Sequence, residues 1–333
     1  MTRTITRRKA IATGLAALGT VAMIGLGNVA LAAEATKLRF SAVFSEQDIR
    51  ADMMKQLAGA LGDKYEFELY YGGNLFKQTT EILAIQRGNL EMGNVAPQDI
   101  ATQIPAFSIL SSAYLFRDAD HLRKFFASDA GTEMKTMAEE QLGIHILGPT
   151  YFGTRQVGLR IDKKINTPED MAGVKLRMPG GDAWQFLGTA LGANPTPMAY
   201  AEVYTGLQTG AIDGQDNPLP NVQNMKFYEV MSQIAMTSHL VGYDLLVVSA
   251  KIWDGMSAEE QEAFQKAADE AINWSQEQHL KKEKELSDFF KEQGLEIYTP
   301  DVDAFRAHAQ KMYLESELSK DWPEGMLERI NAL

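Results

Sequence analysis

The chain contains no cysteine, and this absence removes several classes of function. Without thiols there is no disulfide framework, cysteine nucleophile, iron–sulfur cluster or cysteine-based zinc site. Basic residues are also in the minority, with 32 Lys and Arg against 44 Asp and Glu and a formal net charge of -12. Because a field of that sign repels DNA and anionic membranes, the composition predicts no nucleic-acid partner.

Motifs of common catalytic chemistry are missing as well. No two histidines share the i, i+4 spacing of a zinc helix, and H-E-x-x-H, G-x-S-x-G and the P-loop do not occur. Asp301 and Asp303 could open a calcium loop, but Phe305 and Arg306 stand where that loop needs an oxygen ligand and a glycine. The sequence therefore predicts no catalytic constellation, no metal site and no cofactor.

A long hydrophobic run occurs at one place, near the N-terminus. Positions 1–9 carry four basic residues and no acid, and an uncharged stretch rich in Ala, Gly and Leu continues to Ala32. Ala30-Leu31-Ala32 has the small-x-small pattern of a signal-peptidase site. Residues 1–32 thus predict a cleavable signal peptide and a periplasmic mature protein, exported by either the Sec or the twin-arginine route. A retained membrane anchor is the alternative.

Strand and helix patterns alternate through the mature chain. In the first half, strands are expected at 37–43, 66–71 and 90–93, with helices at 49–61 and 79–87 between them. A second region begins near residue 153, with the expected strands 157–161, 174–178 and 211–213 and the expected helices 182–191 and 200–209. This order predicts βαβ units, two α/β regions and a mainly parallel sheet.

The longest predicted element lies late in the chain. Ser257 and Glu260 form a capping box, and no helix breaker follows before Gly294. One helix of more than thirty residues, running across both domains, fits this pattern. Two helices with a kink near Ser275 fit it equally well. With no repeat or long linker, we expect the chain to cross between the domains more than once.

Two arginines stand out by position. Arg177 ends a predicted strand immediately before Pro179-Gly180-Gly181, where ligands of parallel α/β sheets bind. Arg155 lies at the junction between the two regions. A guanidinium group suits a carboxylate because it donates two parallel hydrogen bonds. An ordinary salt bridge is the alternative role for both. An exported, acidic α/β chain without catalytic motifs indicates a binding protein.

Three sequence blocks carry a family resemblance: Lys-Leu-Arg-Met-Pro at 175–179, Leu-Gly-Ala-Asn-Pro-Thr-Pro-Met at 191–198, and the segment 202–218, which ends in Asp-Gly-Gln-Asp-Asn-Pro. In this order they closely resemble the solute-binding proteins of tripartite ATP-independent periplasmic (TRAP) transporters, the DctP type. Shorter matches at 88–92, 237–239 and 253–261 extend the resemblance over essentially the whole mature chain.

The resemblance implies a two-domain, periplasmic-binding-protein-like α/β fold with a ligand cleft between the domains and a long domain-spanning helix. Domain I would comprise residues 33–152 plus about 243–282, and domain II residues 153–242 plus about 283–333. The cleft would close on a small organic acid and deliver it to the small and large permease subunits in the membrane. No catalytic activity is implied.

The family's site maps onto several residues. Arg177 matches the main carboxylate-binding arginine, and Arg155 matches a second arginine that often assists. Asn217 matches a pocket asparagine, although Asp216 replaces the commoner glutamate before it. Gln78 and Glu81 fit the polar positions after the Gly-Gly turn, with Gln78 the weaker match because that position varies with the ligand.

Side chains around these segments leave the ligand's identity open. Aromatic residues at loop or strand ends, of which we select Phe44, Phe152, Trp184 and Tyr243, favour a flat or apolar monocarboxylate. Polar residues favour a sugar acid or hydroxy acid: Gln78, Asn94, Gln98, Gln215 and Asp216. A C4-dicarboxylate would need a cation for its second carboxylate, for which Lys77 or Arg50 would serve. The sequence slightly favours the aromatic or apolar acid.

Two other classes of function fit the same architecture. One is a secreted lyase or isomerase that uses Asp213, Asp216 or His239. The other is a ligand-sensing protein that reports to a receptor.

Overall fold

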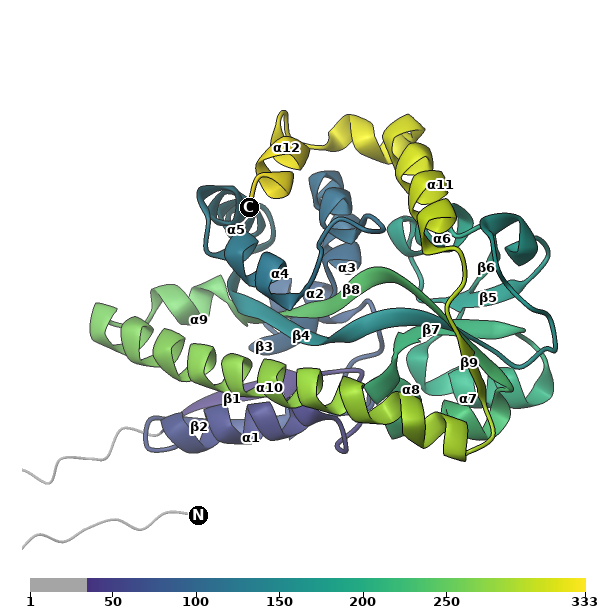
Figure 1. Ribbon diagram of the computed structural model, residues 1–333. Coiled ribbons are helices and arrows are strands. Elements are labelled where there is room, and N and C mark those ends of the chain that lie inside the picture. Colours follow the sequence, from purple (N-terminus) through teal and green to yellow (C-terminus); the bar gives the residue numbers. More distant parts are fainter. Residues whose placement is uncertain (1–34) are drawn as a thin grey trace, which may run out of the picture. The chain divides into compact units, whose positions relative to one another are not determined.

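The structure is a computed structural model, and it describes residues 35–333 (Figure 1). The predicted signal peptide, residues 1–32, lies outside the described residues. Within residues 35–333, no helix combines the length and the apolar character needed to cross a membrane.

A nine-stranded mixed sheet runs through the described residues. Its strands follow the order β2-β1-β3-β8-β4-β7-β5-β6, and β9 pairs with β8. The strands are β1 (Thr36–Ser41), β2 (Tyr65–Tyr70), β3 (Met92–Val95), β4 (Ile144–Leu159), β5 (Lys175–Met178), β6 (Asn194–Pro197), β7 (Gly214–Pro218), β8 (Gln233–Ser249) and β9 (Glu296–Tyr298).

Each end of this sheet is parallel, as the βαβ patterns predict. Strand β1 pairs in parallel with β2 and β3 at one end, here called the β1 end. Strand β5 pairs in parallel with β6 and β7 at the other, the β5 end. The long strands β4 and β8 pair antiparallel with each other and join the two ends. The expectation of a mainly parallel sheet was therefore wrong for the middle of the sheet.

Most of β4 and β8 was not predicted as strand from the sequence, and the cause is physical. Residues 144–159 are buried at almost every position, so they lack the alternation of polar and apolar residues that marks a half-exposed strand. Glycines such as Gly148 and Gly153 interrupt the pattern at shifts in the β4–β8 register. At Gly153 a Cβ atom would approach the Cβ of Pro218 to 2.7 Å, so only glycine fits there.

Helices cover the sheet. They are α1 (Ile49–Leu61), α2 (Glu81–Gln86), α3 (Pro97–Ala101), α4 (Ala119–Phe126), α5 (Asp129–Leu142), α6 (Asp182–Ala190), α7 (Val203–Thr209), α8 (Leu219–Asn224), α9 (Ala250–Asp254), α10 (Ala258–Glu292), α11 (Val302–Glu315) and α12 (Met326–Asn331). The expected helix at 200–209 begins as a 3-10 turn, and the expected strand at 211–213 begins at Gly214.

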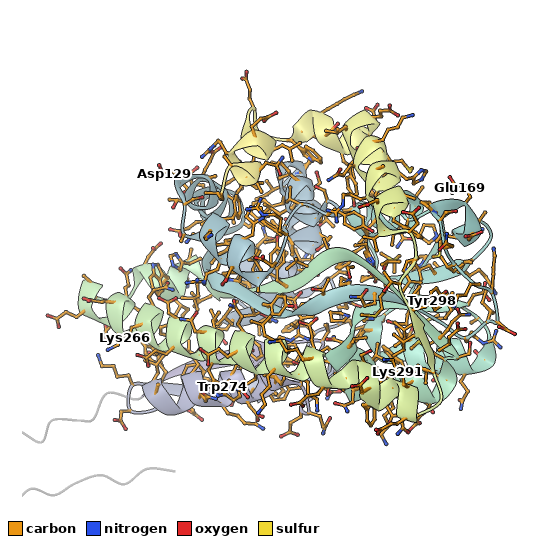
Figure 2. All side chains as sticks on the ribbon, in the orientation of Figure 1. Asp129, Glu169, Lys266, Trp274, Lys291 and Tyr298 are labelled. Atoms are coloured by element: carbon orange, nitrogen blue, oxygen red, sulfur yellow. The ribbon has the colours of Figure 1, made fainter. Side chains whose placement is uncertain are left out.

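Helix α10 is a single helix of 35 residues, so the two-helix alternative was wrong. The predicted capping box is present: Ser257 Oγ accepts from the Glu260 amide at 3.3 Å, and Glu260 Oε2 accepts from the Ser257 amide at 2.9 Å. The helix packs on α1 and β4 and, further along, on α8 and β9 (Figures 1 and 2). Its apolar residues join the core at the β1 end through Phe264 and the core at the β5 end through Phe290. It therefore links both ends of the sheet.

Separate apolar cores flank the two ends of the sheet. Leu38, Phe40 and Leu57 belong to the core at the β1 end, and Leu176 and Leu187 belong to a second core at the β5 end, separate from the one that contains Phe290. After α11 the chain returns to the β1 end, where α12 packs against α5. The boundaries given above for domains I and II stay a prediction.

Candidate functional site

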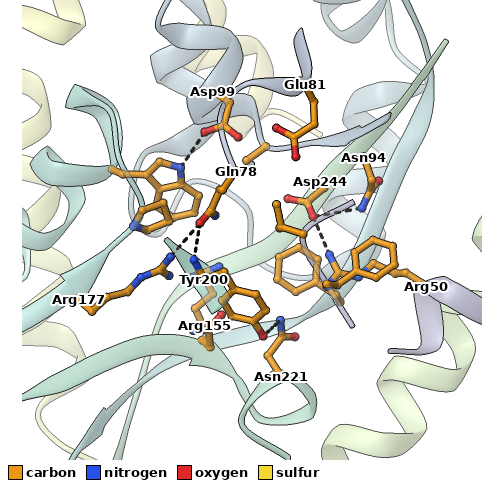
Figure 3. A pocket seen from close by; sticks show the side chains of 17 residues that line it. Arg50, Gln78, Glu81, Asn94, Asp99, Arg155, Arg177, Tyr200, Asn221 and Asp244 are labelled. Carbon is orange, nitrogen blue, oxygen red and sulfur yellow. Dashed lines mark hydrogen bonds and ion pairs between the residues drawn. The ribbon is translucent and has the colours of Figure 1, made fainter. Parts of the chain in front are cut away.

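A cavity lies where segments from both ends of the sheet meet (Figure 3). The residues after β1 and within β3 reach it from one side, and the carboxyl ends of β5 and β7 reach it from the other, as expected for ligand sites of parallel sheets. It is lined by Val43, Phe44, Arg50, Gln78, Glu81, Asn94, Ala96, Asp99, Phe152, Arg155, Arg177, Pro179, Trp184, Tyr200, Asn217, Asn221 and Asp244.

Seven of the eight side chains selected from the sequence meet at this cavity: Arg177, Arg155, Asn217, Gln78, Trp184, Phe44 and Phe152. Tyr243 does not. Its hydroxyl donates to the Leu110 carbonyl at 2.9 Å, and its ring packs against Phe116 and Phe126 in the core. Neighbouring residues of a strand face opposite sides, so Asp244 lines the cavity and Tyr243 cannot.

Arg177 is a buried cation without a carboxylate partner. The residue is 1% exposed, and in residues 35–333 it makes no ion pair. Its Nε donates to the Met198 carbonyl at 2.9 Å, and its Nη2 donates to Gln78 Oε1 at 3.0 Å. Burial lowers the pKa of Arg177 to about 10, because water no longer stabilises the charge. A buried guanidinium held by neutral acceptors is a strong site for an anion.

Arg155 also reaches the cavity, but its charge is already paired. Its Nε and Nη2 donate to Asp216 Oδ2 and Oδ1 at 2.9 and 2.7 Å, and the same carboxylate contacts His239 Nε2 at 2.9 Å. Burial alone raises the pKa of the Asp216 carboxyl, but the Arg155 guanidinium opposes this effect and holds the pKa well below its usual range. Arg155 therefore forms a buried salt bridge, whereas Arg177 forms none within residues 35–333. Asp216, expected at the ligand, lies behind Arg155.

Arg50 is a third arginine at the cavity, and the sequence suggested it only as a cation for the second carboxylate of a dicarboxylate. Asp48 accepts two hydrogen bonds from its side chain at 2.9 Å, and Asp244 accepts one at 2.6 Å. The guanidinium carbon lies 4.3 Å from the ring centre of Phe44 and 4.1 Å from that of Phe152. Two carboxylates and two aromatic rings thus surround this cation.

Three carboxyl groups line the cavity, and sequence reasoning missed two of them, Asp99 and Asp244. Burial raises the pKa of Asp244 to about 6, against the opposing effect of Arg50. Burial and then the nearby Asp244 raise the pKa of Asp99 to about 7. Burial raises the pKa of Glu81 to about 8. Nothing in the local sequence marks Asp99 or Asp244, which lie in a short helix and in the unpredicted strand β8.

Amide side chains complete the lining. Gln78 Oε1 accepts from Arg177 and from the Tyr200 amide at 2.9 Å, and Asn217 Nδ2 donates to Gln215 Oε1 at 2.6 Å. Of the polar residues expected to favour a sugar acid, Gln78 and Asn94 line the cavity, whereas Gln98, Gln215 and Asp216 do not. Asn221, which donates to the Tyr200 hydroxyl at 3.0 Å, was not anticipated.

Together the fold and the cavity define a class of protein. An α/β fold whose two parallel ends enclose a polar cavity is suited to hold a small organic anion when a buried arginine in that cavity has no acid partner among residues 35–333.

Comparison with known proteins agrees with this class. Residues 43–320 match the family described as bacterial extracellular solute-binding protein, family 7 (DctP), and the chain belongs to this family. The sialic acid-binding periplasmic protein SiaP of Vibrio cholerae is 31% identical over 300 residues, which cover 89% of this chain and 93% of that protein. The 2,3-diketo-L-gulonate-binding periplasmic protein YiaO of Escherichia coli is 30% identical, over 87% of this chain and 89% of YiaO.

A solved structure is similar over almost its whole length. It is a TRAP periplasmic solute-binding protein from Roseobacter denitrificans with bound 3-deoxy-D-manno-oct-2-ulosonic acid. It shares 47% sequence identity at a TM-score of 0.88, covering 90% of this chain and 99% of that one. The two-domain TRAP solute-binding fold is thereby confirmed. These relatives are solute-binding proteins and not enzymes, and the family acts in the periplasm with TRAP membrane permeases.

Proposed function

We propose that this protein binds a sugar acid of the 2-keto-3-deoxy type in the periplasm and delivers it to the small and large membrane subunits of a TRAP transporter. The observation that carries the proposal is Arg177, a buried guanidinium at a strand end with no carboxylate partner in residues 35–333. The ligand carboxylate would supply the missing anion.

The cavity lining favours a polyhydroxy acid over the aromatic acid that the sequence slightly favoured. Four amide side chains and three carboxyls face the cavity, and a flat aromatic ring offers no hydrogen-bonding groups to them. The aromatic rings are already in use, since Arg50 stacks against Phe44 and Phe152 and Arg155 lies 4.9 Å from the ring of Trp184. A ligand rich in hydroxyl groups satisfies this lining better.

The relatives support the same class. The structure at 47% identity holds 3-deoxy-D-manno-oct-2-ulosonic acid, and SiaP is named for sialic acid. Both molecules carry a carboxylate beside the anomeric carbon and a chain of hydroxyl groups at the far end. In the proposed complex, Arg177 and the Nη1 group of Arg155 would hold the carboxylate, and Asn217, Gln78 and the acidic residues would hydrogen-bond to the hydroxyls.

A screen of organic acids tests the proposal. The mature protein is titrated by calorimetry and thermal shift with 3-deoxy-D-manno-oct-2-ulosonic acid, N-acetylneuraminate, D-galactonate, succinate and benzoate. At a concentration about 100-fold above its dissociation constant, the true ligand should stabilise the protein by about 2.7 kcal/mol. We expect a sugar acid to do so and to be recovered unchanged, which also separates binding from lyase or isomerase activity. A response to benzoate or succinate alone would refute the proposal.

A further inference from the structure

One wall of the cavity is acidic. Glu81 from the start of α2, Asp99 from α3 and Asp244 from β8 all line it. In Figure 3 these carboxyls lie along one side of the cavity, and Arg177 and Arg155 lie along the opposite side. The cavity is therefore polarised, with a place for an anion at one side only.

The charges around the cavity do not balance when every group is ionised. Three arginines face five acids: Arg50, Arg155 and Arg177 against Glu81, Asp99 and Asp244 in the lining and Asp48 and Asp216 behind it. Full ionisation would leave two excess negative charges, and one ligand carboxylate would add a third. A second carboxylate would have to enter against that excess at the acidic wall.

Glu81 is the least satisfied member of this wall. The residue is 3% exposed, yet its Oε1 atom has no hydrogen-bond partner in residues 35–333. Asp99 accepts one side-chain hydrogen bond, from Trp184 Nε1 at 3.3 Å. Hydrogen-bond donors from the ligand would satisfy these acceptors.

We infer that Glu81, with Asp99 and Asp244, determines specificity for ligands that carry a single carboxylate and present hydroxyl groups at the far end, and excludes dicarboxylates. This inference rests on the proposed function and adds which sugar acids the site accepts. Aldonate-like acids and 2-keto-3-deoxy acids fit, whereas the aldarates, which carry a carboxylate at both ends, do not.

Protonation of the three wall carboxyls makes this selectivity depend on pH. The cations that face these carboxyls are Arg50 from α1, Arg155 from β4 and Arg177 from β5, and Arg50 and Arg155 already form ion pairs. A second ligand carboxylate can bind beside the wall only when the wall carboxyls are protonated. Burial raises the pKa of Glu81 to about 8, so this carboxyl is protonated near neutral pH. Discrimination against a dicarboxylate should therefore increase as the pH rises.

A matched pair of ligands tests the inference. D-Galactonate and galactarate differ only at the carbon farthest from the shared carboxylate, which is a primary alcohol in the first and a carboxylate carbon in the second. Both are titrated, beside 3-deoxy-D-manno-oct-2-ulosonic acid, into the wild-type mature protein, the Glu81→Gln variant and a Glu259→Gln control on the exposed surface of α10.

At about pH 8.5 the wild type and the control should bind galactonate about 100-fold more tightly than galactarate. In the wild type the ratio should shrink at about pH 5.5, and at about pH 8.5 it should be smaller in Glu81→Gln than in the wild type. Equal wild-type affinities at about pH 8.5, or a ratio unchanged by Glu81→Gln at that pH, would overturn the inference. If the ulosonic acid binds but neither member of the pair does, Glu81→Gln should weaken ulosonic acid binding about tenfold, and an unchanged affinity would overturn it. If no sugar acid binds, the proposed function itself fails.

Discussion

Arg177 and Gln78 approach the cavity from opposite ends of the sheet and are joined by one hydrogen bond, 3.0 Å from Nη2 to Oε1. The same Oε1 atom accepts the Tyr200 amide at 2.9 Å, so one neutral side chain ties the loop before α2 to the β5 end. Because an amide oxygen orients the guanidinium without neutralising it, the positive charge of Arg177 stays available for a ligand carboxylate.

Replacing Arg177 by alanine should abolish measurable ligand binding. Loss of a buried charged partner costs about 2–5 kcal/mol, or roughly 30- to several-thousand-fold in affinity. Arg177→Lys should also bind poorly, because an ammonium group cannot donate two parallel hydrogen bonds. The ligand-free variants should remain folded, since no ion pair of Arg177 is lost. Calorimetric titration and ligand-free melting measure both effects, and near-normal affinity in stable Arg177→Ala would refute the assignment.

Replacing Gln78 by glutamate should weaken binding while Arg177 is still present. The new carboxylate has nearly the same shape but would pair with the guanidinium and compete with the ligand. We expect a loss of affinity of at least about tenfold, together with greater stability of the ligand-free protein. Gln78→Ala is the control, because it removes the hydrogen bond without adding a charge. A Gln78→Glu variant that binds better than Gln78→Ala would contradict this role.

Replacing Arg155 by alanine should mainly destabilise the fold. Its partner Asp216 is 0% exposed, so the variant leaves a buried carboxylate without its cation. Breaking a buried ion pair in this way costs about 3–5 kcal/mol, which denaturant unfolding of the ligand-free protein would detect. The double variant Arg155→Met/Asp216→Leu removes both charges and should recover part of the loss. Unchanged stability of Arg155→Ala would show that the pair contributes little.

The ligand-free protein should lose stability as the pH rises from about 5 to about 8. The pKa of Glu81 is raised in the folded state to about 8, above its value in the unfolded chain. Its contribution is therefore fully present below the unfolded pKa and is lost as the pH rises through the folded one. Asp99, with a pKa of about 7, acts in the same direction. Urea unfolding at several pH values across this range gives the free energy of unfolding as a function of pH. This free energy should fall less steeply with pH in Glu81→Gln than in the wild type, and an equally steep fall would contradict the raised pKa.

The N-terminus of the native protein should lie near Ala33. The expectation follows from the basic start, the uncharged stretch and the Ala-Leu-Ala sequence before that residue. N-terminal sequencing of protein recovered from the periplasm measures it directly. An intact Met1 on a membrane-bound form would instead identify the segment as an anchor.

Much of this protein could be predicted from short stretches of sequence. The Ser257–Glu260 capping box and the absence of breakers predicted the long helix α10, because helix ends depend on local hydrogen bonds. The βαβ patterns predicted the parallel ends of the sheet. Arg177 was found because the end of a parallel strand before a Pro-Gly-Gly turn is itself a local signal.

The long-range pairings were beyond such reasoning. Strands β4 and β8 pair although residues 160–232 lie between them, and their continuous burial removes the alternation that would mark them. That pairing also determines which of two adjacent side chains faces the cavity. The sequence suggested Tyr243, but Asp244 faces the cavity and Tyr243 packs in the core.

The sequence by itself therefore determined the family, the local elements and the presence of an arginine at a strand end. Only the tertiary structure decided that Asp216 neutralises Arg155 while no acid among residues 35–333 neutralises Arg177, and that three carboxyls far apart in the sequence line one wall. The physical reason is that the charge a ligand meets depends on which groups lie within a few ångströms of each other in a medium without water. Those neighbours come from segments far apart in the chain.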